Sequence, residues 1–255
     1  MDRTQKSLPV EEPFVLSAAR QPIGISEDGR ISVRIARHRA QLREAFQLLQ
    51  RKYCEAGLSR ATQSLRVLPY HLWRETQIFV AQHRGRVIGS ISLTRDGNEG
   101  GIPMESTYRD QVRQLRDTGR PFGEVSSLTV ESPEDQSTGE VFGQLTRLMM
   151  FHARYVGLEY ILAVVHPRHA RFYERAMGFQ AIGGLSRYQQ VGGQPGIAIL
   201  GHVNDRTRYR SRWQRFYFDG DFSDADLAPN SLSEAERSYF AQFLPQTADT
   251  GRKAA

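Results

Sequence analysis

The stretch V-H-P-R-H-A-R-F-Y-E-R-A-M-G-F, from Val165 to Phe179, is the most informative part of this sequence for the fold. It continues the short apolar run Tyr160-Ile-Leu-Ala-Val-Val165, which has the length and β-branched content of a buried strand. A helix carrying Phe172 and Tyr173 is expected next, and Gly178-Phe179 ends it. The order is therefore strand, short helix, then a Gly-Phe turn.

On both sides of this stretch, hydrophobic periodicity predicts further strands and helices. Alternation or apolar runs predict strands at 31–35, 78–81, 87–93, 122–130, 187–190 and 197–200, with 78–93 forming a hairpin. Three- and four-residue spacing predicts helices from Leu42 to Gly57, after Pro103, and from Val141 to Gly157. This mixture of hairpins and strand–helix–strand units indicates a mixed α/β or α+β sheet.

The composition is that of a globular protein with a basic surface. The chain has 255 residues, of which 39% are hydrophobic and 24% charged, and a net charge of +6. This balance favours acidic partners, such as an acidic protein, anionic lipid or nucleic acid. We expect a cytoplasmic protein, because Cys54 is the only cysteine, Met1–Lys6 lead into no apolar stretch, and no segment is apolar enough to span a membrane.

The chain is expected to divide into three parts. Residues 1–30 look like a tail, residues 31–203 hold the sheet, and residues 204–255 form a basic, aromatic C-terminal extension. In the extension, arginines interleave with aromatic residues between 206 and 218. A last helix should start at Ser233, with Glu236 completing a capping box.

Glu124 is the first candidate for chemistry. It lies on the predicted strand 122–130, where alternation would place Glu124, Ser126, Leu128 and Val130 on one face. Burial in a sheet would raise the pKa of its carboxyl toward a value useful for a general base. The alternative is a structural carboxylate whose hydrogen bonds are satisfied.

The strand–helix–Gly-Phe order resembles the acyl-donor end of the GNAT acyltransferases. Glu124-Val-Ser126 also resembles the strand of two GNAT-like families, the acyl-homoserine lactone synthases and the long-chain N-acyl amino acid synthases. The order of several other segments is more similar to the second family: Leu68-Pro-Tyr-His-Leu72, Ser92-Leu-Thr-Arg-Asp96, Gly-Ile-Pro-Met-Glu105 and the run from His166 to Tyr173. The resemblance covers roughly residues 32–203.

This resemblance implies a GNAT-like α/β (α+β) fold, with a mixed, mostly antiparallel central sheet flanked by helices. It also implies an N-acyltransferase that moves a medium or long fatty acyl chain from acyl carrier protein to the α-amino group of an amino acid. Glu124 would be the base, and Tyr173 would protonate the leaving thiolate. Packing of Tyr173 on the sheet is the alternative.

The donor site implied by the resemblance uses the end of the Glu124 strand and the loop after it. Leu128, Thr129 and Val130 would hold the pantetheine arm and the acyl carbonyl between two strands that splay apart, near His166. Gln136 and Gly139 match only part of the loop that binds the pyrophosphate of coenzyme A, and Glu140 places a carboxylate there. We therefore expect acyl-phosphopantetheine on a carrier protein as donor, with a coenzyme A thioester as the alternative. No permanently bound cofactor and no metal are expected.

Two surfaces are assigned to partners. A basic patch for acidic acyl carrier protein is expected at Arg147, Arg154, Arg168, Arg171 and Arg175, unless these form an ordinary solvated helix face. The amino-acid acceptor is assigned to Ser126, Arg95 and Asp96.

Alternatives in three classes stay open at the level of sequence: other acyl transfers, nucleic-acid binding and membrane contact. Acyl-homoserine lactone synthesis and coenzyme A-dependent acetyl transfer belong to the same reaction class. Nucleic-acid binding through segment 206–218 would suit single strands, but we favour a basic, amphipathic segment that packs on the sheet or closes the site. Transient contact of the same segment with a membrane surface is the third.

Overall fold

The computed structural model describes residues 31–59, 63–97, 100–133, 137–220 and 222–245, so the expected tail 1–30 lies outside the described residues. Eight strands form a sheet in the order β1-β2-β3-β4-β5-β8-β6, with β7 paired to β8 beside this path. The strands are β1 Ser32–Ile35, β2 Thr76–His83, β3 Arg86–Arg95, β4 Phe122–Val130, β5 Tyr160–Val165, β6 Gln180–Ala181, β7 Ser186–Tyr188 and β8 Gln194–His202. Among the strands that the structure describes, only β4 and β5 pair in parallel. The expected mixed, mostly antiparallel sheet is confirmed.

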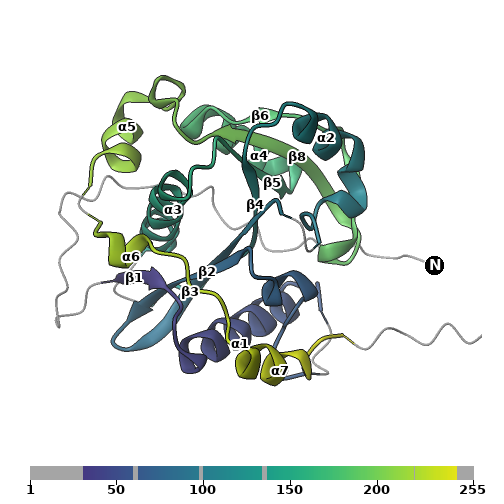
Figure 1. The fold of residues 1–255 in the computed structure, drawn as a ribbon, viewed down its shortest axis with the longest axis vertical. Helices are drawn as coiled ribbons and strands as arrows, with labels where there is room; N and C mark the ends of the chain where they lie inside the picture. Colours follow the sequence, from purple (N-terminus) through teal and green to yellow (C-terminus); the bar gives the residue numbers. More distant parts are fainter. Residues whose placement is uncertain (1–30, 60–62, 98–99, 134–136, 221, 246–255) are drawn as a thin grey trace, which may run out of the picture.

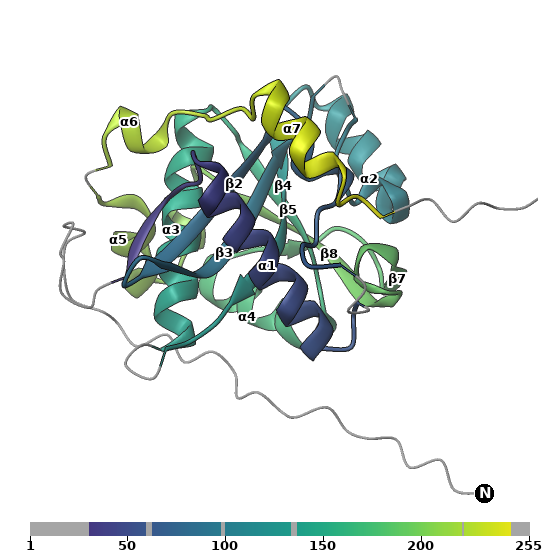
Figure 2. The ribbon, with the colours of Figure 1, turned by 90° about the horizontal axis from the view of Figure 1, so that it is seen from below.

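Helices cover both faces of this sheet (Figure 1). They are α1 Arg39–Glu55, α2 Glu105–Asp117, α3 Thr138–Tyr155, α4 Pro167–Met177, α5 Ser211–Phe218, α6 Asp224–Leu227 and α7 Glu234–Ala241. The 3₁₀ turns are η1 Pro69–Leu72, η2 Gln189–Val191 and η3 Arg206–Arg208. Helix α1 lies across the β2–β3 half, and α2 covers the β5–β8 half of the same face (Figure 2). Helices α3 and α4 pack on the opposite face.

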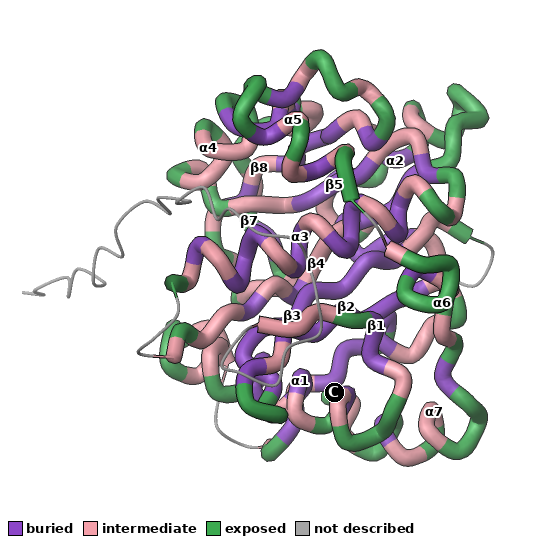
Figure 3. Tube along the Cα trace, turned by 90° about the vertical axis from the view of Figure 1, so that its left-hand side faces the viewer, coloured by how far each residue is buried: buried purple, intermediate pink, exposed green. Residues whose placement is uncertain are grey.

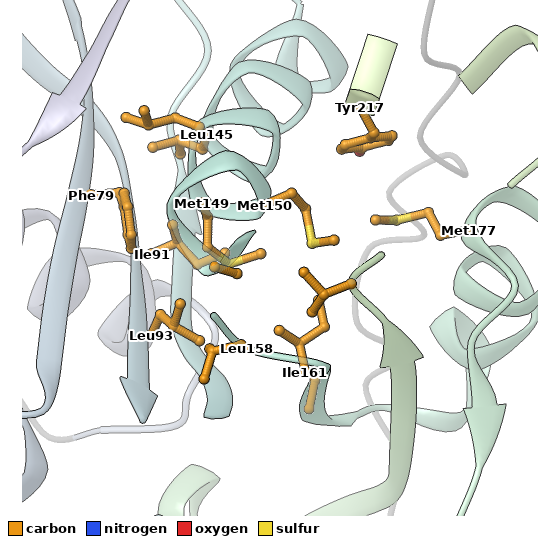
Figure 4. Packing of buried hydrophobic residues seen from close by; sticks show 14 of the residues in the cluster. Phe79, Ile91, Leu93, Leu145, Met149, Met150, Leu158, Ile161, Met177 and Tyr217 are labelled. Carbon is orange, nitrogen blue, oxygen red and sulfur yellow. The ribbon is translucent and has the colours of Figure 1, made fainter. Parts of the chain in front are cut away.

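The core follows these layers. In Figure 3 buried segments run through the central strands, whereas exposed segments lie on the outer turns of the helices and in the loops. The cluster on the α3 face includes Phe79, Leu93, Leu145, Met149 and Ile161. Figure 4 shows these side chains packed between the strands and a helix. Alternating strand residues supply the other face, where Leu162, Ala198 and Leu200 pack with α2 residues.

Helices α3, α4 and α7 begin or end at the residues that the sequence predicts. Gly178 closes α4 with φ 66°, a left-handed conformation that glycine adopts without steric cost. The Ser233 side chain accepts a hydrogen bond from the Glu236 N–H at the start of α7, and the capping box is complete. At the start of α3, Ser137 caps the Glu140 N–H. The strand expected at 187–190 is shorter, because the chain turns into η2 after Tyr188.

Strands β4 and β5 separate along part of their length. Their parallel pairing runs from Phe122↔Tyr160 to Val125↔Ala163 and then stops, although β4 continues to Val130 and β5 to Val165. Because the two strands no longer pair, a gap opens in the middle of the sheet.

A bulge in β4 changes which residues share a face. Ser126 pairs with Ser92 and Thr129 with Ser90, so two residues of β4 stand opposite one of β3, and Ser127 has φ 52°. Leu128 and Val130 therefore pack on the α3 face with Val125. The prediction that Leu128 and Val130 share a face with Glu124 was wrong, because simple alternation cannot anticipate the extra residue.

The C-terminal segment folds against the sheet and its helices. Tyr209, Trp213 and Tyr217 are 2%, 5% and 1% exposed and belong to the cluster under α3. They are therefore not free to stack on the bases of a nucleic acid. Segment 206–218 is packed as expected, but helix α5, which the sequence did not predict, lies mainly on α3 rather than on the sheet. Leu232, Tyr239, Phe240 and Phe243 pack in the cluster that α1 residues form with β2. Among the described helices, none is long and apolar enough to cross a bilayer.

Candidate active site

A cavity of about 870 Å³ lies where β4 and β5 separate. On the α1–α2 face it is lined by Tyr53, Leu58, Tyr70, Glu124, Ser126, Tyr188 and Gln190, and on the α3–α4 face by Ile91, Leu128, Phe142, Thr146, Met149, Tyr173, Met177 and Phe179. Since both groups line one cavity, the cavity passes through the sheet. It is polar around Glu124 and mainly apolar on the α3–α4 face.

Glu124 lies on β4 at the polar side of the cavity and is 1% exposed. Its Oε2 accepts a hydrogen bond from the Met104 N–H at 2.6 Å, and its Oε1 accepts one from the Tyr188 hydroxyl at 3.1 Å. Burial raises the pKa of the Glu124 carboxyl to about 8, and the two hydrogen bonds oppose this rise because they stabilise the carboxylate. A carboxyl with this pKa becomes deprotonated, and so able to accept a proton, as the pH rises toward and above 8.

Tyr188 is the partner that fixes the Glu124 side chain from another strand. It lies on β7, is 6% exposed and lines the cavity. Burial and the nearby Glu124 carboxylate raise the pKa of the Tyr188 phenol, so its hydroxyl stays protonated and donates to Glu124. Sequence analysis missed this role, because nothing in the local pattern around Tyr188 indicates which distant carboxylate it contacts.

Ser127, at the bulge, has two partners from turn η1. The Tyr70 hydroxyl is 2.9 Å and the His71 Nε2 3.0 Å from the Ser127 Oγ. All three residues are buried. The segment Leu68–Leu72 contributed to the family resemblance, yet its contact with β4 has no signal in the sequence.

The predicted donor residues fall into three groups. Leu128, Thr129, Val130 and His166 line the cavity, and so does Tyr173, whose phenol pKa is raised by burial and by the nearby Tyr217. The His166 side chain also caps α4, where its Nδ1 accepts from the Arg168 N–H at 3.3 Å. Gly139 is buried in the first turn of α3 and does not line the cavity, and Gln136 lies outside the described residues.

The five predicted arginines do not form one patch. The Arg147 Nη2 donates to the Asp219 carbonyl at 2.7 Å, and its guanidinium lies over three phenylalanine rings. Arg154 donates to the carbonyls of Val203 and Tyr217. These two residues therefore fasten the C-terminal segment to α3. Arg168, Arg171 and Arg175 are exposed on α4, and Arg168 lies on the rim of the cavity.

The predicted acceptor residues also separate. Ser126 lines the cavity two residues from Glu124. Asp96 forms a salt bridge with Arg116 at 2.6 Å, and neither Arg95 nor Asp96 lines the cavity. Among the residues that the structure describes, no group of three or more His, Cys, Asp or Glu side chains is arranged to hold a metal ion.

The mixed sheet that opens between β4 and β5, with a buried carboxylate beside the opening, has the GNAT-like architecture expected from the sequence. The sequence comparison identifies the family. Residues 44–202 match the model of the FeeM N-acyl amino acid synthase family, and the chain belongs to that family. This confirms the resemblance seen in the sequence.

Solved structures share the fold. The N-acyl amino acid synthase FeeM from uncultured soil microbes is 21% identical, with a TM-score of 0.63 over 71% of this chain and 96% of its own. The acyl-homoserine lactone synthase LasI is 14% identical, with a TM-score of 0.57 over 76% of this chain and 98% of its own. BjaI, a coenzyme A-dependent acyl-homoserine lactone synthase, is 16% identical, with a TM-score of 0.54 over 76% of this chain and 97% of its own. No curated protein sequence matches the chain.

Proposed function

We propose that this N-acyltransferase moves a medium or long fatty acyl chain from an acyl carrier protein thioester to the α-amino group of an amino acid. The observation that carries the proposal is the cavity through the sheet, because it joins a polar environment around Glu124 to an apolar one on the α3–α4 face. The acceptor amine would enter on the Glu124 face. The acyl chain would lie among Phe142, Met149, Met177 and Phe179 on the other face.

The chemistry follows from this arrangement. The acceptor nitrogen attacks the thioester carbonyl carbon, and Glu124 takes a proton from that nitrogen. Backbone N–H groups at the β4 bulge would stabilise the tetrahedral oxyanion. The carbon–sulfur bond then breaks, and Tyr173 would give its proton to the leaving thiolate. The products are an N-acyl amino acid and the carrier-bound thiol.

The first turn of α3 favours a carrier protein over coenzyme A as donor. Helix N-termini attract anions, and the pyrophosphate of coenzyme A would need that attraction. Here Ser137 already caps the Glu140 N–H, and the Glu140 carboxylate lies in the same turn. The single phosphate of a carrier-bound pantetheine makes a smaller demand on this turn.

The carrier would dock at the α4 surface, defined here as Arg168, Arg171 and Arg175. These three side chains are exposed, and none forms a salt bridge with an acidic residue in the part of the chain that the structure describes. Arg168 borders the cavity, so a carrier docked there could pass its pantetheine arm inward.

The proposal is tested with purified enzyme, acyl carrier proteins loaded with defined chains, and a mixture of amino acids. Mass spectrometry should detect N-acyl amino acids. Glu124→Gln should lower kcat by about 10²- to 10⁴-fold, the usual contribution of a general base. Glu105→Gln is the matched control, because Glu105 lies near Glu124 but forms a surface ion pair with Arg116 outside the cavity.

Three results would count against specific parts of the proposal. No N-acyl amino acid from the wild-type enzyme with any acceptor would exclude the reaction. Product from acyl-coenzyme A but not from acyl carrier protein would exclude the donor. Undiminished activity in a folded Glu124→Gln variant would exclude Glu124 as the base.

A further inference from the structure

The bulge of β4 is a backbone conformation that requires support. Ser127 has φ 52°, and Arg84 in the β2–β3 turn is the only other non-glycine residue with positive φ among the described residues. Ser127 and Leu128 have no partner residue in the ladder with β3 or in the ladder with β5. A serine held in the left-handed region is strained, and such strain persists only where surrounding contacts determine it.

Turn η1 supplies these contacts. The Leu68 N–H donates to the His71 Nδ1 at 3.2 Å, so the proton of the neutral ring lies on Nε2. Burial lowers the pKa of His71 to about 3, which keeps the ring neutral. The His71 Nε2–H therefore donates to the Ser127 Oγ at 3.0 Å, while the Tyr70 hydroxyl lies 2.9 Å from the same oxygen.

The turn that carries this pair is itself fixed from two sides. The Thr76 hydroxyl donates to the Tyr70 carbonyl at 2.6 Å, which ties η1 to the start of β2. The His71 ring stacks on Phe46 of α1 with 5.1 Å between centroids, and Phe46 contacts Phe240 of α7 at the same distance. Tyr70 and His71 are 4% and 1% exposed, so their positions depend on packing rather than on solvent.

We propose that Tyr70 and His71 are positioning residues: they hold Ser127 in the left-handed conformation of the β4 bulge for the acyl-transfer step. The proposal rests on the proposed function, in which backbone N–H groups of the bulge lie next to the thioester carbonyl. Without the two contacts, the strain at Ser127 is no longer offset, and the segment Ser126–Leu128 can leave the conformation that faces the cavity. A shift of about 1 Å in a catalytic arrangement can cost about 10²-fold in rate.

The experiment compares four variants with the wild-type enzyme. His71→Leu removes the donor to Ser127 but keeps a buried apolar side chain, and it should lower kcat by about 10- to 100-fold with little change in the KM for the amino acid. His71→Gln keeps an N–H donor and should recover most of the loss. Ser127→Gly adopts positive φ without support, so it provides the background for a coupling test, with its own kcat as the reference. In the Ser127→Gly background, His71→Leu should then have an effect below about threefold, because the two sites are coupled.

A second readout needs no substrate. Hydrogen–deuterium exchange of peptides covering residues 122–130, followed by mass spectrometry, should be faster in His71→Leu than in the wild type and partly restored in His71→Gln. If the wild-type enzyme makes no N-acyl amino acid, the proposed function fails, whereas this comparison still tests the support of the bulge.

Several results would overturn the inference. One is wild-type kcat together with unchanged exchange in His71→Leu. Another is an equal loss from His71→Leu in the wild-type and Ser127→Gly backgrounds. If His71→Leu does not unfold cooperatively in urea, Ser127→Ala and Ser127→Gly decide the question. Alanine lacks the hydroxyl and keeps the strain, so equal kcat values for these two variants would contradict the proposal.

Discussion

Glu124 shows how one buried side chain acquires a function from its surroundings. Its carboxyl is removed from water, which raises its pKa to about 8, yet each of its oxygens accepts a hydrogen bond. A proton acceptor works only when it is deprotonated. The proposed enzyme should therefore become more active as the pH rises toward and through 8, as long as no other group limits the rate.

Tyr188→Phe tests the link between this pKa and the hydrogen bond. The variant removes a donor that stabilises the charged carboxylate, so the pKa of Glu124 should rise. The midpoint of the acid limb of kcat/KM should move to higher pH, by roughly one unit if the bond contributes about 1.4 kcal/mol. Activity at pH 7 should fall, and activity well above the midpoint should recover.

The measurement is a pH profile of kcat/KM for both proteins. Tyr160→Phe is the control, because Tyr160 lies on neighbouring β5 and its ring contacts His202 rather than Glu124. A midpoint in Tyr188→Phe that is unchanged or displaced to lower pH would show that Tyr188 does not stabilise the carboxylate.

At the scale of elements, β4 organises the site because it is irregular. Regular pairing with β3 and β5 would close the sheet, whereas the bulge and the end of the β4–β5 ladder leave room for a cavity. Turn η1 and helix α7 lie on the face of Glu124, and they support this strand through Ser127, His71 and Phe46.

Helix α7 belongs to the C-terminal extension, yet Phe240 is fully buried. Its ring meets Phe46 edge-on at 5.1 Å. Phe240→Ala should lower the free energy of unfolding by about 3–5 kcal/mol, because it leaves a cavity between α7 and α1. Urea unfolding followed by circular dichroism measures this loss.

Leu185→Ala provides the comparison, because Leu185 is 68% exposed and its loss should change stability by less than about 0.5 kcal/mol. A Phe240→Ala protein as stable as Leu185→Ala would mean that α7 is not part of the cooperative fold.

At the scale of the whole molecule, the sheet separates the proposed acceptor side from the proposed acyl side, and the cavity joins them. The C-terminal segment covers the α3 side, where Arg147 and Arg154 fasten it. On helix α4, by contrast, Arg171 and Arg175 are exposed. A large acidic donor would therefore meet the protein at α4.

Reversing charge on α4 tests the docking of the carrier. Arg171→Glu with Arg175→Glu should raise the KM for acyl carrier protein by roughly tenfold and reduce its dependence on salt, since rim charges mainly affect association. The KM for a free acyl-pantetheine thioester should stay the same, because neither residue lines the cavity.

The matched control is Arg109→Glu with Arg113→Glu, an exposed pair at the same spacing on α2. Equal effects of the two double variants would indicate a general electrostatic attraction. No effect of the α4 pair would remove this surface from the proposal.

The sequence by itself determined most of the elements, their ends and the family. These features depend on neighbours in the chain: hydrophobic period, a serine cap at α7, a glycine at the end of α4, and motifs in a fixed order. It also placed Glu124 on a central strand.

Only the tertiary structure decided what surrounds Glu124 and how β4 is held. Tyr188 reaches Glu124 across 64 residues of sequence, and His71 reaches Ser127 across 56. A register break is invisible to alternation, so the faces of Leu128 and Val130 could not be predicted. The burial of Tyr209, Trp213 and Tyr217 likewise follows from packing between distant segments, which no local pattern encodes.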